Sequence, residues 1–390
     1  MQAFLEAALP ADAQQATLVG RVWIEGQGAV LVRADAQADA LIDLSRLAAT
    51  SSALLEMPDA AAAVRAHRGE RLGSLREAIA NSDHARRDPA RPWLMAPCDL
   101  QALKAAGVTF VASMLERVIE EQARGDPAQA ESARAAVVAV IGDDLAAIRP
   151  GSPEAARLKE VLLERGLWSQ YLEVGIGPDA EIFTKSQPMS AVGTGAQAGI
   201  HPGSAWNNPE PEIVLAVNSR GETVGATLGN DVNLRDFEGR SALLLGKAKD
   251  NNASCAIGPF IRLFDAHFSI ADVRRCDLDM RVLGEEGFDM RGASSLARIS
   301  RDPLDLVAQA IGPNHQYPDG FMLFLGTMFA PTQDRHGPGQ GFTHVPGDLV
   351  AISTPSLGTL VNRVETTDRI PPWRYGIGAL IHDLGRRGLT

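Results

Sequence analysis

One stretch, PEPEIVLAVNSRGETVGATLGND at residues 209–231, constrains the fold more than any other part of the sequence. The apolar run EIVLAV predicts a buried strand, NSRG is a good turn, and the chain then returns as a second strand. Residues i and i+2 of a strand share a face, so Glu210 and Glu212 lie on one side. The hairpin brings Asp231 back toward the same end, where three carboxylates are therefore expected to converge.

Converging carboxylates repel one another, and the pKa of each rises unless a cation lies among them. Mg²⁺ and Mn²⁺ take oxygen ligands, and Mg²⁺ keeps positions open for water or substrate. The residues alone leave two interpretations open. Glu210, Glu212 and Asp231 form a divalent-cation site, or they are solvated acids at a strand end and in a turn.

Composition limits the classes of partner. The chain has 390 residues, enough for two domains with a sizeable core. Its net charge of −11 argues against nucleic acid or an anionic membrane, because both attract a basic surface. Three cysteines, far apart, predict neither a disulfide framework nor a zinc ribbon. The N-terminus lacks a secretory signal and no apolar run is long enough to cross a membrane, so we expect a cytoplasmic protein.

The chain changes character near residue 165, where alanine-rich helix formers give way to short Val/Ile/Leu runs alternating with Gly and Pro. This pattern predicts an α+β fold with a smaller N-terminal α/β domain, 1–150, and a β-rich catalytic domain, 151–390. Helices are predicted at 53–66, 74–80, 99–126 (capped by Asp99, with a disturbed middle at 107–110), 127–148 and 153–166. Strands are predicted at 180–184, 212–218, 222–228, 256–264, 278–283, 321–325 and 348–353.

The motifs PEPEIVLAV…GNDVNLRD and KAKDNNASCAIGPF together resemble the fumarylacetoacetate hydrolase family. Its pattern is an E-x-E pair, a later N-D segment with R-D, a lysine, and then G-P. The matching positions are Glu210, Glu212, Asp231, Arg235, Asp236, Lys249, Gly258 and Pro259. The segment AISTPSLG is similar to the family's T-P-x-G loop and places Thr354 at the site.

The resemblance covers about residues 105–390 and implies a mixed β-roll or barrel catalytic domain. It implies that Glu210, Glu212 and Asp231 hold Mg²⁺, with Mn²⁺ as a substitute. It also implies a small anionic keto-acid substrate and a homodimer or homotetramer.

Two features favour the sugar-acid dehydratases within this family. Glu212 and Asp231 lie only 19 residues apart, which is shorter than in the acylpyruvate hydrolases. The hydrolases also carry a Tyr-x-x-His-x-x-Glu lid, matched here by TFVASMLE within a lid segment near 107–120. Phe110 replaces the tyrosine and Ser113 replaces the histidine that helps to activate water, while Glu116 remains. The resemblance therefore implies Mg²⁺-dependent dehydration of a 2-keto-3-deoxy-pentonate (D-xylonate or D-arabinonate) to 2,5-dioxopentanoate.

Roles for individual residues follow as hypotheses. Lys249 is the expected base for the C3 proton, with Lys247 as a weaker rival. Glu181 is the expected acid for the leaving hydroxyl, or else forms a strand-end salt bridge. Lys185 is interpreted as a partner of the substrate carboxylate or as a surface lysine. The predicted substrate-binding residues are Phe110, Ser113 and Thr354.

Two rival functions remain open from the sequence. A diketo-acid hydrolase or decarboxylase of the same fold would need another group in place of the lid histidine. A metabolite-binding homologue without catalysis is disfavoured because all three acids and Lys249 are retained.

Overall fold

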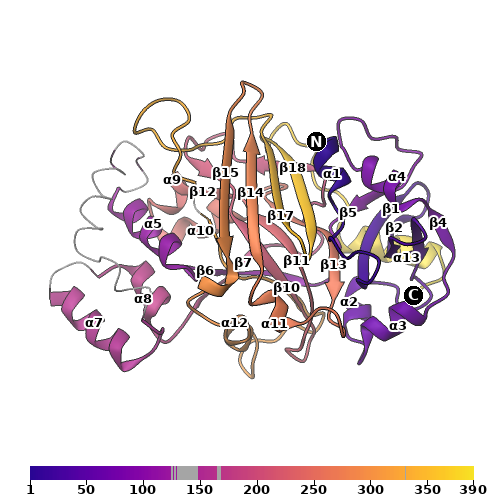
Figure 1. The fold of residues 1–390 in the computed structure, drawn as a ribbon, viewed down its shortest axis with the longest axis horizontal. Helices are drawn as coiled ribbons and strands as arrows, with labels where there is room; N and C mark the ends of the chain where they lie inside the picture. The colour runs from indigo at the N-terminus through magenta and orange to yellow at the C-terminus, as the bar shows by residue number, and fades with distance from the viewer. Residues whose placement is uncertain (124–125, 127–128, 130–147, 165–167, 330) are drawn as a thin grey trace.

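The computed structural model describes residues 1–123, 126, 129, 148–164, 168–329 and 331–390 (Figure 1). In the helix that follows residue 110, the side chains at 111–113, 115, 116 and 120 lie outside this description. Within the described residues, no helix combines the length and the apolar character that a membrane span needs.

A large mixed sheet forms the centre of the molecule. Its strands run in the order β4-β3-β2-β1-β13-β11-β10-β16-β6-β7, and β5 pairs with β1. The pairing of β16 with β6 is parallel, whereas β10 and β11 form the antiparallel hairpin predicted from the sequence. The bounds are β1 Leu18–Ile24, β2 Gly28–Asp35, β3 Ala40–Asp43, β4 Arg71–Gly73, β5 Trp93–Met95, β6 Ala102–Gly107, β7 Glu181–Ser186, β10 Pro211–Val217, β11 Thr223–Asp231, β13 Cys255–Leu263 and β16 Phe321–Phe324.

A second sheet, in the order β15-β14-β17-β18-β8, stands in front of the first in Figure 1. Apolar residues of both sheets share one core, which includes Ile213 and Leu215 from β10 and Ile352 from β17. A third, two-stranded sheet pairs β9 with β12. The bounds are β8 Gln197–Ile200, β9 Asn207–Asn208, β12 Asn233–Leu234, β14 Asp277–Leu283, β15 Asp289–Ser295, β17 Leu349–Thr354 and β18 Gly358–Thr366.

Two groups of helices lie at the two ends of the molecule, and α11 and α12 lie below the sheets in the view of Figure 1. At one end, α5, α7 and α8 share an apolar cluster around Met114, Leu162 and Leu172. At the other end, α1 to α4 and the C-terminal α13 lie beside the N-terminal strands. The bounds are α1 Gln2–Glu6, α2 Ser51–Leu55, α3 Ala60–Ala66, α4 Leu75–Ala80, α5 Val111–Gln122, α7 Pro153–Glu164, α8 Gln170–Ile176, α9 Arg235–Glu238, α10 Leu245–Lys249, α11 Ile270–Val273, α12 Pro303–Ala310 and α13 Ile377–Arg386, with short 3-10 turns at Ala242–Leu244 and Leu296–Arg298.

The predicted α+β class is confirmed, and each of the predicted strands overlaps an observed one. The single helix predicted at 99–126 is wrong in its first half, because residues 102–107 form β6. Buried Leu103 and Ala105 pair in parallel with β16, so tertiary packing overrides the helix propensity of LKAA. Asp99 instead accepts hydrogen bonds from the backbone of Ser51 and Ser52. Most of the helix predicted at 127–148 lies outside the described residues.

The division at residue 150 stays a prediction. Strands from before and after residue 150 pair with each other in the large sheet. Strand β6 lies between β16 and β7, and β1 pairs with β13. Helix α13 also packs against β2 from the opposite end of the sequence.

Candidate metal and active site

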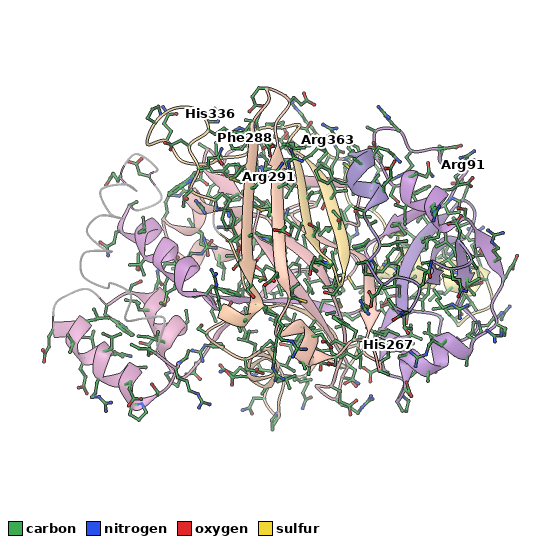
Figure 2. All side chains as sticks on the ribbon, viewed as in Figure 1. Arg91, His267, Phe288, Arg291, His336 and Arg363 are labelled. Atoms are coloured by element: carbon green, nitrogen blue, oxygen red, sulfur yellow. The ribbon has the colours of Figure 1, made fainter. Side chains whose placement is uncertain are left out.

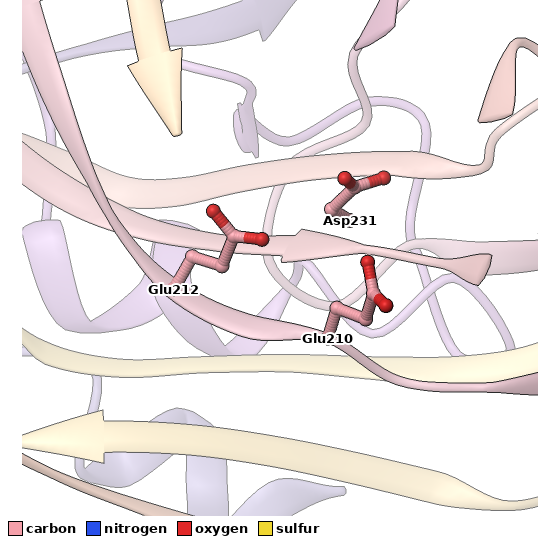
Figure 3. Close-up of side chains that lie close together, drawn as sticks. All are labelled: Glu210, Glu212 and Asp231. Carbon is pink, nitrogen blue, oxygen red and sulfur yellow. The ribbon is translucent and has the colours of Figure 1, made fainter. Parts of the chain in front are cut away.

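The β10–β11 hairpin brings the three predicted acids together. Glu212 lies opposite Gly229, and the backbone N–H of Asp231 donates to the carbonyl of Glu210 at 3.0 Å. All three side chains are buried, and one oxygen of each lies within 4.8 Å of the others. Figure 3 shows the two glutamates on one strand facing Asp231 on the other.

The local frame of the acids is rigid because every residue of β10 is buried. Its odd-numbered residues, such as Ile213, pack in the core between the sheets, and Val214 packs in a second core on the other face. Directly after β16, the backbone N–H of Gly326 donates to Glu212 Oε2 at 2.7 Å. The amide oxygen of Asn230 accepts from the backbone N–H of Glu210 at 3.0 Å.

Three buried cations contact the acids. The Nζ atom of Lys249 donates to Glu210 and, at 3.0 Å, to Asp231. The Nζ atom of Lys185 lies 2.9 Å from Asp231 Oδ1. Arg117, on α5, pairs with Glu210 and also with Glu238 on α9, at 2.9 Å.

Negative groups outnumber positive ones in this cluster, which we call the acid site. Besides the three acids, Glu238 pairs with Arg117, and the charges of Glu238, Arg117, Lys249 and Glu210 all act on Glu181. Five carboxyl groups against three cations leave two excess negative charges when all are ionised. The members of the acid site are Glu181, Glu210, Glu212, Asp231, Glu238, Arg117, Lys185 and Lys249.

The pKa values of two carboxyl groups, Glu212 and Glu181, reflect the excess of carboxyl groups over cations. Burial, and then the charges of Asp231 and Glu210, raises the pKa of Glu212 well above its usual range. Burial, and then the charge of Glu238, raises the pKa of Glu181 to about 7. Burial also raises the pKa of Asp231, but Lys185 and Lys249 outweigh it, so the net pKa is lowered.

The acid site fits a hard divalent cation. Its converging ligand atoms are carboxylate oxygens, which suit Mg²⁺ or Mn²⁺ rather than a thiophilic metal. A dication would also balance the two excess negative charges and so offset the cost of burying unpaired carboxylates. The geometry therefore favours the cation-site interpretation over solvated acids, because all three carboxylates are buried.

The structure places the predicted acid–base residues at this site. Lys249 ends α10 and is 2 % exposed. Burial lowers its pKa, but Asp231 and Glu210 raise it more, so Lys249 carries a proton in this arrangement. Glu181 begins β7 opposite Gly107, within electrostatic reach of Lys249.

The interpretations of the other two lysines need correction. Lys185 is fully buried and donates to the carbonyls of Val232 and Lys249, at 3.1 and 2.5 Å, besides its ion pair with Asp231. It is therefore a buried group of the acid site and not a surface lysine, while its pairing with the substrate carboxylate stays a prediction. Lys247 is exposed and lies over the ring of Phe237, so it does not rival Lys249.

Thr354 does not lie with the acids. Asp231 pairs with Cys255 at one end of β13, whereas Arg262 at the other end binds the carbonyl of Ser356, next to Thr354. Seven residues separate these two ends, which at ~3.3 Å per residue is about 23 Å. The T-P-x-G match at 354 was misleading because the segment closes a turn between two strands of the second sheet.

Sequence reasoning missed three residues. Thr327 follows Gly326, whose N–H binds Glu212, and the GT dipeptide directly after a buried strand was the available signal. Arg117 and Glu238 pair across α5 and α9, and no local pattern relates these two helices.

The other two predicted substrate-binding residues belong to the segment before and within α5. Phe110 is buried in the core between the sheets. Its neighbour Thr109 donates to the carbonyl of Leu325, one residue before Gly326, but Phe110 packs with Ile213 and Leu215, on the face of β10 opposite to that of Glu212 and Val214. The side chain of Ser113 lies outside the described residues, and so does that of Glu116.

Comparison with known proteins agrees with this fold and this cluster of acids. Residues 172–365 match the family model described as the C-terminal domain of fumarylacetoacetate (FAA) hydrolase. The matched segment is similar to this family and contains the motifs with Glu210, Glu212, Asp231 and Lys249 that carried the resemblance.

Two curated relatives match about half of the chain. A 2-dehydro-3-deoxy-D-arabinonate dehydratase of Saccharolobus solfataricus is 29 % identical over 190 residues, covering 49 % of this chain and 60 % of the relative. A probable 2-keto-3-deoxyxylonate dehydratase of Haloferax volcanii is 30 % identical over 203 residues, covering 52 % and 66 %. The chain thus spans less than two thirds of either relative.

Solved structures share the fold. A 2-keto-3-deoxy-D-arabinonate dehydratase complexed with magnesium and 2,5-dioxopentanoate has a TM-score of 0.63 at 19 % identity, covering 90 % of this chain and 99 % of that one. A fumarylacetoacetate hydrolase from Exiguobacterium antarcticum has a TM-score of 0.53 at 15 % identity, covering 90 % and 100 %. At these identities the likeness establishes the architecture alone.

Proposed function

We propose that the protein is a Mg²⁺-dependent dehydratase that converts a 2-keto-3-deoxy-pentonate into 2,5-dioxopentanoate, with Mn²⁺ as a substitute cofactor. The D-xylonate and D-arabinonate names describe one molecule here, because C2 is a ketone and C3 a methylene, which leaves C4 as the stereocentre. The observation that carries the proposal is the convergence of three buried carboxyl groups, Glu210, Glu212 and Asp231, with one oxygen of each within 4.8 Å of the others. The dehydratase names of both curated relatives support the choice of reaction.

The acid site suits a keto acid whose charge needs a cation. Glu210, Glu212 and Asp231 would hold the metal. When bound, the dication supplies Lewis-acid polarisation of the keto oxygen and charge for the substrate carboxylate. The buried cations of the site are already paired with its acids, so they offer little charge to an anionic substrate without the metal.

Lys249 is proposed to exchange the proton at C3. Its buried Nζ contacts two of the three acids, so it lies beside the carbon next to a keto group held there. As a base it must first give up the proton that it carries, and burial favours that neutral form.

Glu181 is proposed to protonate the hydroxyl that leaves C4. A pKa of about 7 keeps this carboxyl group partly protonated near neutral pH, which a general acid requires. Loss of the C3 proton and the C4 hydroxyl leaves a C3–C4 double bond. Transfer of a proton from C5 to C3 then gives the C4–C5 enol, and this enol tautomerises to the aldehyde when its hydroxyl proton moves to C4. Phe110 and Ser113 remain predicted contacts of the substrate. Thr327, next to the Gly326 whose N–H binds Glu212, is proposed in place of Thr354, and its hydroxyl, which donates to the carbonyl of Phe329 at 3.0 Å, would turn toward the substrate.

A direct assay tests the reaction. Purified protein with Mg²⁺ and 2-keto-3-deoxy-D-pentonate is expected to form 2,5-dioxopentanoate, measured by coupling to a semialdehyde dehydrogenase. EDTA should stop the reaction and added Mg²⁺ should restore it. Acylpyruvates and oxaloacetate serve as comparison substrates. Turnover of these alone would overturn the dehydratase proposal in favour of a hydrolase or decarboxylase.

A further inference from the structure

Two buried asparagines extend the row of acids along the hairpin. In the small sheet, Asn208 lies opposite Asn233. The main hairpin pairs Pro211 with Asn230 and Glu212 with Gly229, and this register places Glu210 opposite Asp231. The pairs follow one another at intervals of two residues. The chain passes from Asn208 to Glu210 to Glu212 on one side, and from Asn233 back to Asp231 and Gly229 on the other.

This shared register puts the asparagines on the same face as the acids. Residues two apart in an extended chain share a face. The register continues across the short break between the two sheets, at 209–210 and 232, so Asn208 follows Glu210 and Asn233 follows Asp231 along one side. The order along this side is the Asn208–Asn233 pair, the Glu210–Asp231 pair, and then Glu212 opposite Gly229.

The amides of this pair have unused hydrogen-bonding capacity. Asn208 and Asn233 are 1 % and 0 % exposed. The Nδ2 atom of Asn208 donates to the carbonyl of Pro209, whereas its Oδ1 has no partner. Neither Nδ2 nor Oδ1 of Asn233 has a partner. Buried polar groups are normally paired, so unpaired ones beside a candidate site indicate a polar ligand.

The chemistry of the pair matches a hydroxyl group. Together the two amides offer one donor and two acceptors, and a hydroxyl group both donates and accepts. A carboxylate would accept from Asn233 Nδ2 but would meet the acceptor oxygens unfavourably. The ~3.3 Å rise per residue puts the asparagine pair ~7 Å from the Glu210–Asp231 pair, a distance that a five-carbon acid can span.

We propose that Asn208 and Asn233 bind the C5 hydroxyl of the substrate and thereby select hydroxylated keto acids. This inference rests on the proposed function, in which the keto-acid end of the ligand lies at the three acids. The substrate chain then runs along the strands from these acids toward the asparagines and away from Glu212.

Calorimetry with two acids that cannot lose water provides the test. Both 5-hydroxy-2-oxopentanoate and 2-oxopentanoate lack a C4 hydroxyl, and they differ only at C5. With Mg²⁺ present, the wild-type protein is expected to bind the hydroxylated acid roughly tenfold more tightly, as one or two hydrogen bonds would give. Asn233→Leu, of similar volume, should remove this preference while leaving the affinity for 2-oxopentanoate within about twofold.

Thr227→Val is the matched control. Thr227 lies on the same face of β11 beyond Gly229, is buried, and also has an unpartnered hydroxyl. It lies on the far side of the acids from the asparagines, so its loss should leave the preference intact. Asn208→Ala, which removes the other acceptor, should lower the preference and serves as the test if Asn233→Leu does not fold.

The outcomes separate the two proposals. If neither acid binds the wild-type protein with Mg²⁺, the proposed function fails and this inference fails with it. If both acids bind but the asparagine variants keep the wild-type preference, or Thr227→Val loses it equally, the inference alone is overturned. Equal affinity of the wild-type protein for both acids also overturns it.

Discussion

Two charge clusters in this protein, each built around a buried carboxylate, differ in how that carboxylate is paired. In the loop cluster, defined by Arg335, His344, Asp348 and Glu286, Arg335 donates to both oxygens of Asp348, at 2.6 and 2.7 Å, and pairs with Glu286. Arg335 also lies 4.6 Å from the ring centroid of Phe288, labelled in Figure 2. Nδ1 of His344 lies 2.9 Å from Asp348. Here the buried carboxylate of Asp348 has a guanidinium on both of its oxygens, whereas the acid site holds two more carboxyl groups than cations.

The pKa shifts of Asp348 and Glu212 run in opposite directions. Burial raises the pKa of Asp348, but the hydrogen bonds from Arg335 and His344 outweigh it and lower the pKa to about 2. For Glu212, burial and like charges both raise the pKa. Burial of charge therefore does not by itself mark a functional site. The imbalance of charge distinguishes a place built for a ligand from one built for stability.

The largest expected effect is on catalysis at the acid site. Lys249→Ala should lower kcat at least ~1000-fold, because it removes the proposed proton acceptor. Divalent-cation binding, measured by calorimetry, should persist. Retained turnover with intact cation binding would show that Lys249 is not the base.

The loop cluster should respond in stability instead. Asp348→Asn removes the carboxylate that faces Arg335 and should lower the free energy of unfolding by about 3 kcal/mol, measured by urea denaturation. The pKa of Asp348 is lower in the folded protein than in the unfolded chain, so its ionised form stabilises the fold at pH values above its ordinary pKa. This stabilisation is lost as the pH falls toward about 2. Specific activity of the folded fraction should stay within about twofold. A large loss of kcat in Asp348→Asn would show that the loop cluster also acts in catalysis, which contradicts the proposed difference between the two clusters.

The pH profile probes Glu181. A general acid must carry its proton, and a pKa of about 7 means that the protonated fraction falls as pH rises through 7. We therefore expect kcat to decline above about pH 7. Glu181→Gln should lower kcat and abolish that decline. An unchanged alkaline limb in this variant would assign the titration to another group.

The smallest expected effect is a gain in stability. Glu212→Gln removes a buried carboxylate from the cluster with excess negative charge, so the cation-free protein should become about 1 kcal/mol more stable. Thermal unfolding in EDTA measures this change. If Glu212→Gln is instead less stable than the wild-type protein, the carboxylate of Glu212 is paired with a positive group, as that of Asp348 is.

The sequence predicted the hairpin and its three acids because both depend on local pattern. A stretch of 25 residues contains everything that this prediction needs: the apolar run EIVLAV, the NSRG turn, and the acids Glu210, Glu212 and Asp231. The short segment TPSLG misplaced Thr354 because five residues do not specify which of the two sheets they join. The pairing of Arg117 with Glu238 joins helices far apart in the chain, and LKAA forms a strand only because β16 lies beside it. These features depend on tertiary contacts that the local sequence does not encode.

Titration of Mn²⁺ into the cation-free protein, followed by calorimetry, tests the central claim most directly. The account predicts one site per chain in the wild-type protein, a loss of at least ~100-fold in affinity in Glu212→Gln, and unchanged binding in Asp348→Asn. Wild-type affinity in Glu212→Gln, or equal loss in both variants, would contradict the claim that the excess of buried carboxylates defines the cation site.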